Sequence, residues 1–319
     1  MISHTHLPLP PLADFVALFW YYEGYVMPHS KERLLPTGTT ELVINLREDR
    51  IRTYDGSATA MQSFGGAVVC GAHSEPFAID TSQEESIIGV HFKPGGAFPF
   101  FKLPAGELHN LHVGLDDLWG AVARDLRDQL LAATTPASKF RVLEKYLLAQ
   151  TVKPLARHPA VSFALDEFRS APQARAIAEI TDQIGLSARR FIQVFSDQVG
   201  LTPKLFCRVQ RFQEVLRQVG MSVEVDWADV ASSCGYFDQA HFIHDFQAFS
   251  GFTPTAWLAL RGEHQNHVHA LPVTTEDIEQ HENDCQLTSN ECYLQGKCGF
   301  CNGGYGAEEK LSSRWIWAR

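Results

Sequence analysis

The sequence lacks any apolar run as long as the roughly 18 residues of a membrane-spanning helix, so we expect no transmembrane segment. Its first residues, MISHTHLPLPPLADF, contain no basic stretch followed by an apolar core, the pattern of a secretory signal peptide. No glycine-rich phosphate loop and no pair of nucleophile and base is evident. These absences favour a cytoplasmic protein that is neither an enzyme nor bound to a membrane.

Basic residues are also scarce. The 319 residues include 27 Lys and Arg against 37 Asp and Glu, which gives a net charge of −10. A balance of this sign argues against nonspecific binding to nucleic acid through charge alone. The apolar fraction of 45% and the charged fraction of 20% predict a globular chain, long enough for two domains with a large core.

The stretch VASSCGYFDQAHFIHDFQAFSGFTPTAW, residues 230–257, has the pattern of a helix, a tight turn and a second helix. Gly235 can adopt the positive φ that ends the first helix, and Asp238 is placed to cap the second. The second helix carries an apolar stripe of Phe242, Phe246 and Phe249 and an opposite face of Gln239, Ile243, His244 and Gln247. Such a face suits a reader of the DNA major groove, although a three-helix scaffold with a solvated face has the same pattern.

Residues 177–206, IAEITDQIGLSARRFIQVFSDQVGLTPKLF, repeat this pattern. Ser187 takes the N-cap position, and the exposed face carries Ala188, Arg189, Ile192 and Gln193. Five residues precede their counterparts Phe242, Phe246, Gly251, Thr253 and Pro254 by 51 positions, namely Phe191, Phe195, Gly200, Thr202 and Pro203. Two copies are too few for a solenoid and instead predict two helix-turn-helix units joined by a helix at roughly Lys204–Val219. Such a linker would let both units enter successive major grooves, about 34 Å apart.

Several motifs stand in the order and spacing of one known family: Gly185-Leu186-Ser187, Phe191 with Phe195, Gly200-Leu201-Thr202-Pro203, Arg208, Arg211-Phe212, Cys234-Gly235-Tyr236-Phe237-Asp238-Gln239-Ala240-His241-Phe242 and Gly251-Phe252-Thr253-Pro254. On these residues the chain resembles the AraC/XylS-type transcription regulators over about residues 158–262. The resemblance implies that DNA is contacted by the second helix of each unit and its cap. The residues so placed are Ser187, Arg189, Arg190, Ile192, Gln193, Asp238, Gln239, Ile243 and His244.

Two departures from the family's pattern affect these positions. Ile192 and Ile243 can make only apolar contacts, such as with a thymine methyl group, and His244 stands where such proteins often have Arg. Residues 158–262 also hold nine Lys and Arg against eleven Asp and Glu. Local positive charge would have to come from Arg189, Arg190, Lys204, Arg208, Arg211 and Arg217. We therefore expect modest nonspecific affinity and a shallow salt dependence.

In residues 1–157 the stretch Phe15–Tyr22 is a buried strand or the end of a short helix. Strand-like segments separated by turns follow at Glu41–Leu46, Ala67–Cys70, Phe77–Asp80 and Ile87–Phe92. Many short strands of this kind suggest a sandwich or a small barrel. From Leu115 onward, apolar residues at helical spacing predict two helices joined at Thr134-Thr135-Pro136. The phrases LLPTGTTELVINL and GVHFKPGGAFPFF are similar to one subgroup of the same family, which implies a barrel that senses a ligand and helices that pair two subunits.

Three features of this half leave alternatives open. A set of His73, His91, His109, His112 and Glu107 could bind metal in a cupin-like enzyme or consist of solvated and capping side chains. The fragment HFKPGGAF could hold an anion or form an ordinary turn. The aromatic residues of FVALFWYY could line an apolar pocket or belong to the core.

Residues 263–319 differ in composition from the rest, with clustered histidines, an acidic run and four cysteines within 17 residues: Cys285, Cys292, Cys298 and Cys301. The last two have the CxxC spacing that lets two thiolates reach one metal ion, so a zinc site formed by all four is one interpretation. The gap between the first two is longer than usual for zinc. The other interpretation is a largely disordered acidic extension with reduced thiols.

The predicted fold is α+β. It has a β-rich, barrel-like domain with trailing helices at residues 1–157, an all-α double helix-turn-helix domain at 158–262, and a largely disordered tail at 263–319. The predicted function is sequence-specific DNA binding by a transcription regulator. The resemblance implies double-stranded DNA, a small-molecule effector, a second copy of the chain and RNA polymerase as partners. The alternative is a metal- or thiol-responsive regulator with the tail cysteines as its sensor.

Overall fold

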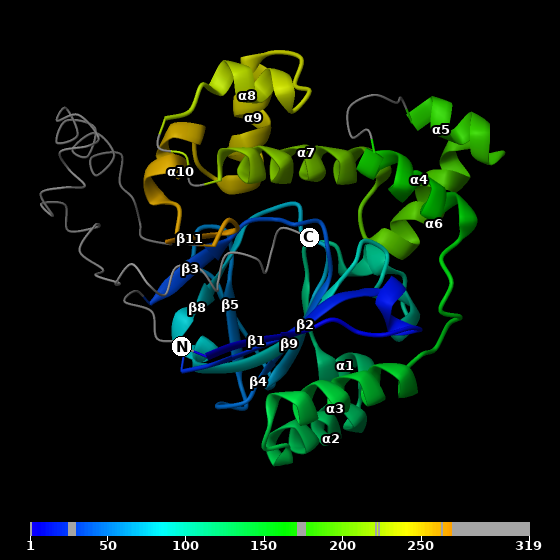
Figure 1. Ribbon diagram of the computed structural model, residues 1–319, viewed down its shortest axis with the longest axis vertical. Helices are drawn as coiled ribbons and strands as arrows, with labels where there is room; N and C mark the ends of the chain where they lie inside the picture. The colour runs from blue at the N-terminus through cyan, green and yellow to red at the C-terminus, as the bar shows by residue number, and fades with distance from the viewer. Residues whose placement is uncertain are drawn as a thin grey trace, which may run out of the picture.

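The structure is a computed structural model that describes residues 2–24, 30–170, 177–220, 222, 224–262 and 264–269. It contains a β-rich part formed by two antiparallel sheets, with a small group of helices on one side and a larger helical part on the other (Figure 1). The chain runs through these parts in the predicted order. The α+β class, with a β-rich N-terminal region and a helical C-terminal region, is therefore confirmed.

The larger sheet has six strands in the order β1-β2-β9-β4-β7-β10. Their bounds are Ile2–His6 (β1), Val16–Glu23 (β2), Ser86–Phe92 (β9), Glu41–Asn45 (β4), Ala67–Cys70 (β7) and His112–Gly114 (β10). The central strand β9 is almost continuously buried, which explains its apolar sequence SIIGVHF. Gly89 in its middle lets β2 approach closely, since a Cβ atom there would lie 2.3 Å from the ring of Trp20.

The smaller sheet has five strands in the order β11-β3-β8-β5-β6. Their bounds are His267–His269 (β11), Lys31–Leu34 (β3), Phe77–Asp80 (β8), Ile51–Tyr54 (β5) and Met61–Phe64 (β6). Within the described ranges no strand pairing joins the two sheets or closes either of them. The barrel-like domain expected from the turn spacing is therefore an open pair of sheets.

Three helices cover the larger sheet, namely α1 (Leu115–Trp119), α2 (Ala121–Ala132) and α3 (Pro136–Ala149) (Figure 1). The predicted hairpin is formed by α2 and α3. Helix α3 begins at a capping box, in which the Thr135 hydroxyl accepts a hydrogen bond from the backbone N–H of Ser138. The apolar stripes of the hairpin are buried against the sheet through Leu126, Leu130, Phe140, Leu143 and Leu147.

The larger helical part consists of α4 (Pro159–Ser170), α5 (Ile177–Ile184), α6 (Ala188–Val199), α7 (Pro203–Val219), α8 (Trp227–Ser233), α9 (Gln239–Ser250) and α10 (Pro254–Leu260). Helices α5 and α6 form the first predicted unit, α8 and α9 form the second, and α7 is the predicted linking helix. In Figure 1, α7 lies across the β-rich part with one unit at each end. Apolar residues of both units and of α7 form one continuous cluster, so the two units share a core.

The chain returns to the β-rich part after α10. Strand β11 pairs antiparallel with β3, so that His267 lies opposite Leu34 and Val268 lies opposite Arg33. The tail predicted to begin at residue 263 therefore includes a strand of the smaller sheet, β11, at His267–His269. Its four cysteines lie outside the described residues.

Polar contacts join α7 to the loop that follows β3. The side-chain amide of Gln213 donates to the carbonyl of Pro36 at 2.8 Å, and that of Gln210 donates to the carbonyl of Thr37 at 3.2 Å. Leu35, from the same loop, is buried in the apolar cluster of the helical part. The linking helix is thereby fixed against the β-rich part. None of the described helices is both long and apolar enough to cross a membrane.

Candidate functional site

We call the second helix of each helix-turn-helix unit, which is predicted to enter the DNA major groove, its reading helix. The reading helix of the second unit, α9, begins at the expected cap. The Asp238 carboxylate accepts a hydrogen bond from the backbone N–H of His241 at 2.7 Å, which satisfies one of the unpaired donors at the helix start. Gln239 and His244 are exposed on the predicted face. Ile243 is half-buried against the apolar cluster, so only part of its side chain is available to a ligand.

The first reading helix, α6, begins at Ser187, whose hydroxyl accepts from the backbone N–H of Arg190 at 3.3 Å. Arg189, Arg190 and Gln193 are all exposed, and Ile192 is 39% exposed. The Gln193 side-chain amide donates to the carboxylate of Asp197 at 2.8 Å. This bond has to open before the Gln193 amide can pair with a DNA base. The spacing of residues in the sequence does not reveal this constraint.

Two of the six predicted basic side chains have a structural role inside the helical part. Arg208 of α7 donates to the carboxylate of Asp245 at 2.6 Å through Nη2 and at 3.2 Å through Nε, and only 1% of the Asp245 side chain is exposed. Arg211 donates to the carbonyl of Gly235 and lies 4.0 Å from Asp245. Arg208 and Arg211 were expected to supply local positive charge for DNA, but the buried carboxylate of Asp245 on α9 lies against both.

The sequence pattern contained a signal for this buried pair. Asp245 stands between Phe242 and Phe246 on the inward face of α9, where a charged side chain needs a partner. Arg217 is also paired, with Glu214 one turn earlier on α7. In the described part of the chain, the exposed cations left near the reading helices are Arg189, Arg190 and Lys204, and all three belong to the first unit or the start of α7.

An exposed aromatic ring lies beside the second reading helix. Phe237 directly precedes the cap residue Asp238, and 93% of it is accessible to solvent. No role was predicted for Phe237. Its position alone did not reveal this exposure, because an apolar residue directly before a helix cap commonly packs on the first turn of that helix.

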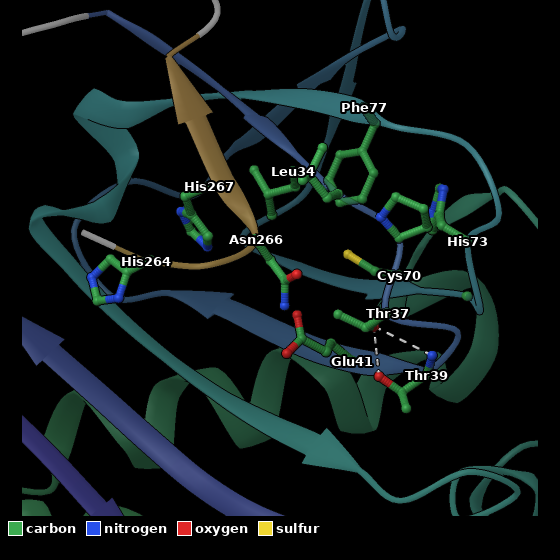
Figure 2. Close-up of a pocket in the computed structure, with 13 residues that line it drawn as sticks. Leu34, Thr37, Thr39, Glu41, Cys70, His73, Phe77, His264, Asn266 and His267 are labelled. Carbon is green, nitrogen blue, oxygen red and sulfur yellow. Dashed lines mark hydrogen bonds between the residues drawn. The ribbon is translucent and has the colours of Figure 1, made fainter. Parts of the chain in front are cut away.

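A second candidate site is a cavity of about 50 Å³ in the β-rich part (Figure 2). Its lining includes Leu34, Thr39, Glu41, Cys70, Asn266 and His267, so it combines strands of both sheets with the segment that follows the helical part. In Figure 2 the Asn266 amide and the Glu41 carboxylate point toward each other. Glu41 also accepts a hydrogen bond of 2.6 Å from Nδ1 of His91. A cavity of this size has room for a few water molecules or one small polar group.

The histidines weighed as metal ligands in the N-terminal half do not converge. His91 is bonded to Glu41, and His109 is bonded to the hydroxyl of Ser74 at 2.9 Å. The rings of His73 and His112 lie 4.7 Å apart and pack on Phe77, and Glu107 is exposed on another segment. Searched among the described residues, this set offers no group of three donors around one point.

The buried histidines predict an acid-sensitive fold. Burial lowers the pKa of His73 to about 3 and that of His112 to about 4. Both rings are neutral in the folded protein at pH 7, whereas in the unfolded chain they bind a proton below a pKa of about 6.5. The unfolded state therefore binds more protons below that pH, and stability falls as the pH drops from about 6.5 towards 4. The shift of His112 alone corresponds to about 3 kcal/mol.

Urea unfolding at pH values between 7 and about 4 measures this loss. His112→Phe keeps an aromatic ring at the site and removes the titrating group, so its stability should depend less on pH in this window. His244→Phe changes an exposed histidine and serves as the matched control. An acid dependence in His112→Phe equal to that of the unchanged protein would contradict the assignment.

Three other side chains have donor atoms within 4.8 Å of one another, namely Glu32, Glu84 and His267. The ring N–H of His267 donates to Glu32 Oε2 at 2.6 Å. Burial alone would lower the pKa of His267, but the bond to Glu32 and the neighbouring carboxylates raise that pKa to about 9. Burial raises the pKa of Glu84 to about 7. None of the three was predicted as a site residue, because the fold brings them together from distant parts of the sequence.

Comparisons with known proteins identify two segments of the chain. Residues 180–259 match a family described as a helix-turn-helix domain, and residues 4–114 match a family described as a domain of unknown function. No curated protein matches the chain.

Among solved structures, the chain is similar to ToxT from Vibrio cholerae. One such structure is 8% identical, with 81% of this chain and 98% of that chain covered and a TM-score of 0.42. An apo form from strain SCE256 is 10% identical, with 77% and 97% covered and a TM-score of 0.41. ToxT of strain O395 bound to (E)-4-(8-methylnaphthalen-1-yl)but-3-enoic acid is 9% identical, with 76% and 98% covered and a TM-score of 0.42.

The helix-turn-helix match falls on the two capped helix pairs and on the helix that links them. It spans α6 to α9 and reaches into α5 and α10 at its ends. The same residues carry the paired motifs, the caps and the shared core described above. Residues 180–259 of the chain therefore form a helix-turn-helix domain, in which two capped helix pairs are joined by α7.

Proposed function

We propose that α6 and α9 enter two successive major grooves of one DNA duplex. The observation that carries this proposal is the arrangement around α7, which holds one capped helix with an exposed polar face at each end (Figure 1). Because both units share one core with α7, their separation is fixed. A fixed pair of helices suits two half-sites about 34 Å apart on one face of the duplex.

The exposed side chains of α6 have chemistry that suits base contacts. Arg189 can donate two hydrogen bonds to guanine, and Gln193 can pair with adenine once it leaves Asp197. Ile192 can contact a thymine methyl group. The cap residue Ser187 keeps the first-turn N–H groups in place, where they can meet a phosphate together with the charge of Arg190.

The exposed side chains of α9 carry less positive charge than those of α6. Gln239 can pair with adenine and His244 can donate to a base or a phosphate, whereas Ile243 contributes the exposed part of an apolar side chain. Asp238 remains the cap rather than a DNA ligand, since a free carboxylate would repel phosphate. The first unit should therefore supply most of the affinity.

Arg189→Ala is expected to weaken binding to the cognate site by about 1–3 kcal/mol and to relax the preference for guanine at one position. The melting temperature should not change, because the side chain is exposed and makes no hydrogen bond within the described residues. Binding is measured by fluorescence anisotropy on a site selected from random-sequence DNA by the purified protein.

Arg141→Ala is the matched control, because it removes an exposed arginine from α3 on the opposite side of the β-rich part. Equal affinity of Arg189→Ala and Arg141→Ala for the selected site would contradict the role of Arg189. A selected consensus with a single box would contradict the pairing of two grooves.

The cavity in the β-rich part supports a proposal about the effector. Its walls include Asn266 and His267, which follow the DNA-binding domain, and the Pro36–Thr37 loop, which is bonded to α7. A small polar molecule bound beside Glu41 would act at once on the segment with Asn266 and His267 and on the Pro36–Thr37 loop. We therefore propose this cavity as the place where an effector changes the position of the helix-turn-helix units.

Pairing with a second copy of the chain and contact with RNA polymerase stay predictions. A cytoplasmic location is also still a prediction. The same holds for zinc at Cys285, Cys292, Cys298 and Cys301 and for a regulator that uses them as its sensor.

A further inference from the structure

Glu32, Glu84 and His267 meet where the end of the helical part returns to the smaller sheet. Glu32 is on β3, His267 is on β11, and Glu84 is on the short 3-10 helix Thr81–Glu85 that follows β8. Glu32 is buried and the other two are half-buried. Three chain segments therefore contribute one donor side chain each to a place that is largely closed to water.

One donor atom at this place has no partner. The Oε2 atom of Glu84 is buried and, within the described ranges, accepts no hydrogen bond. Leaving a buried carboxylate oxygen without a donor is costly, and such an atom points to a bound group. His267 is the residue nearby that could neutralise the carboxylate, but its ring N–H is directed to Glu32. Two carboxylates thus share one imidazole.

The donor set suits a divalent metal ion. Carboxylate oxygens and imidazole nitrogen are the ligands of zinc and manganese ions, and they bind at about 2.0–2.2 Å in zinc sites. The three donor atoms lie within 4.8 Å of one another, so small side-chain rotations would bring them around one ion. A fourth ligand is within reach, because the His264 ring lies 5.5 Å from that of His267, and water can fill any open position.

We propose that Glu32, Glu84 and His267 bind a divalent first-row transition-metal ion. The ion would take the place of the proton between His267 and Glu32 and would give the unpartnered oxygen of Glu84 a ligand bond. It would also join β11, and with it the end of the DNA-binding domain, to the N-terminal sheet. This proposal does not depend on how the reading helices contact DNA.

The test uses the full chain without a histidine tag and with Cys285, Cys292, Cys298 and Cys301 replaced by Ser, so that tail thiols cannot bind the metal. Equilibrium dialysis against zinc alone, with the metal measured by atomic emission, should give about one zinc per chain. Glu84→Gln and His267→Gln should each weaken binding by about tenfold or more. Glu85→Gln, which changes the neighbouring glutamate that pairs with Arg47, should bind zinc like the parent protein.

A thermal unfolding experiment separates loss of the site from loss of the fold. Glu84→Gln keeps the shape of the side chain, so without metal it should melt no earlier than the parent protein. Zinc should raise the melting temperature of the parent and of Glu85→Gln but not that of Glu84→Gln. Absence of zinc and manganese binding in the cysteine-free chain, or equal binding by Glu84→Gln, would overturn the proposal. Zinc bound only when the four cysteines are present would overturn it as well.

Discussion

Asp245→Ala is expected to lower the free energy of unfolding of the helical part by about 3–5 kcal/mol, because it leaves a partly buried arginine charge without its partner. Arg208 donates through two nitrogens to Asp245, and Arg211 and His241 lie within 4.0 Å of the same carboxylate. Removal of the carboxylate therefore takes this partner away from both guanidinium groups. Urea unfolding at pH 7 measures the change, and DNA affinity should fall with it because α9 loses its connection to α7.

Asp182→Ala removes an exposed carboxylate on α5 and should change stability by no more than about 0.5 kcal/mol. A variant that combines Asp245→Leu with Arg208→Met replaces the pair by apolar side chains and should recover most of the lost stability. If Asp245→Ala unfolds at the same urea concentration as Asp182→Ala, the buried pair does not stabilise the domain.

Phe195→Ala and Phe246→Ala are each expected to lower the free energy of unfolding by about 3–5 kcal/mol. Both rings are fully buried, one in each helix-turn-helix unit. Their centroids lie 5.7 Å and 5.3 Å from those of Phe206 and Phe212, both on α7. The two units are thus connected through α7, and either substitution should destabilise the whole helical part instead of one unit.

Hydrogen exchange measured by mass spectrometry tests this coupling. In Phe246→Ala the protection of α6 should fall together with that of α9, although the substituted residue lies in the second unit. Ile192→Ala, which truncates an exposed side chain of α6, should leave the protection of both helices close to that of the unchanged protein. Unchanged protection of α6 in Phe246→Ala would show that the units unfold independently.

The parts of the fold that rest on local chemistry could be predicted from the sequence. Ser187 and Asp238 cap their helices as expected, because a cap depends on residues within one turn. The strands β4, β7, β8 and β9 were also expected at nearly the observed positions, since each is a short apolar segment between turns.

Other elements depend on partners that are distant in the sequence. Strands β3 and β5 have the sequences KERL and IRTY, which show no apolar alternation, and they are strands because β8 pairs with both. Arg208 resembled an exposed cation until the fold placed Asp245, 37 residues later, against it. Glu32 and His267 are 235 residues apart, so no spacing within the sequence could have joined them.

The return of residues 267–269 to β3 has a consequence for how the chain folds as it is synthesised. Strand β3 lies next to the edge of the smaller sheet and is covered on that side only by β11. While the first 157 residues emerge, this side of β3 presents unpaired N–H and C=O groups to other chains. The sheet is completed only after the whole helix-turn-helix domain has been made. The smaller sheet therefore reaches its final form only after the second part of the chain has been made, and the open edge of β3 is one place where partly synthesised chains could associate.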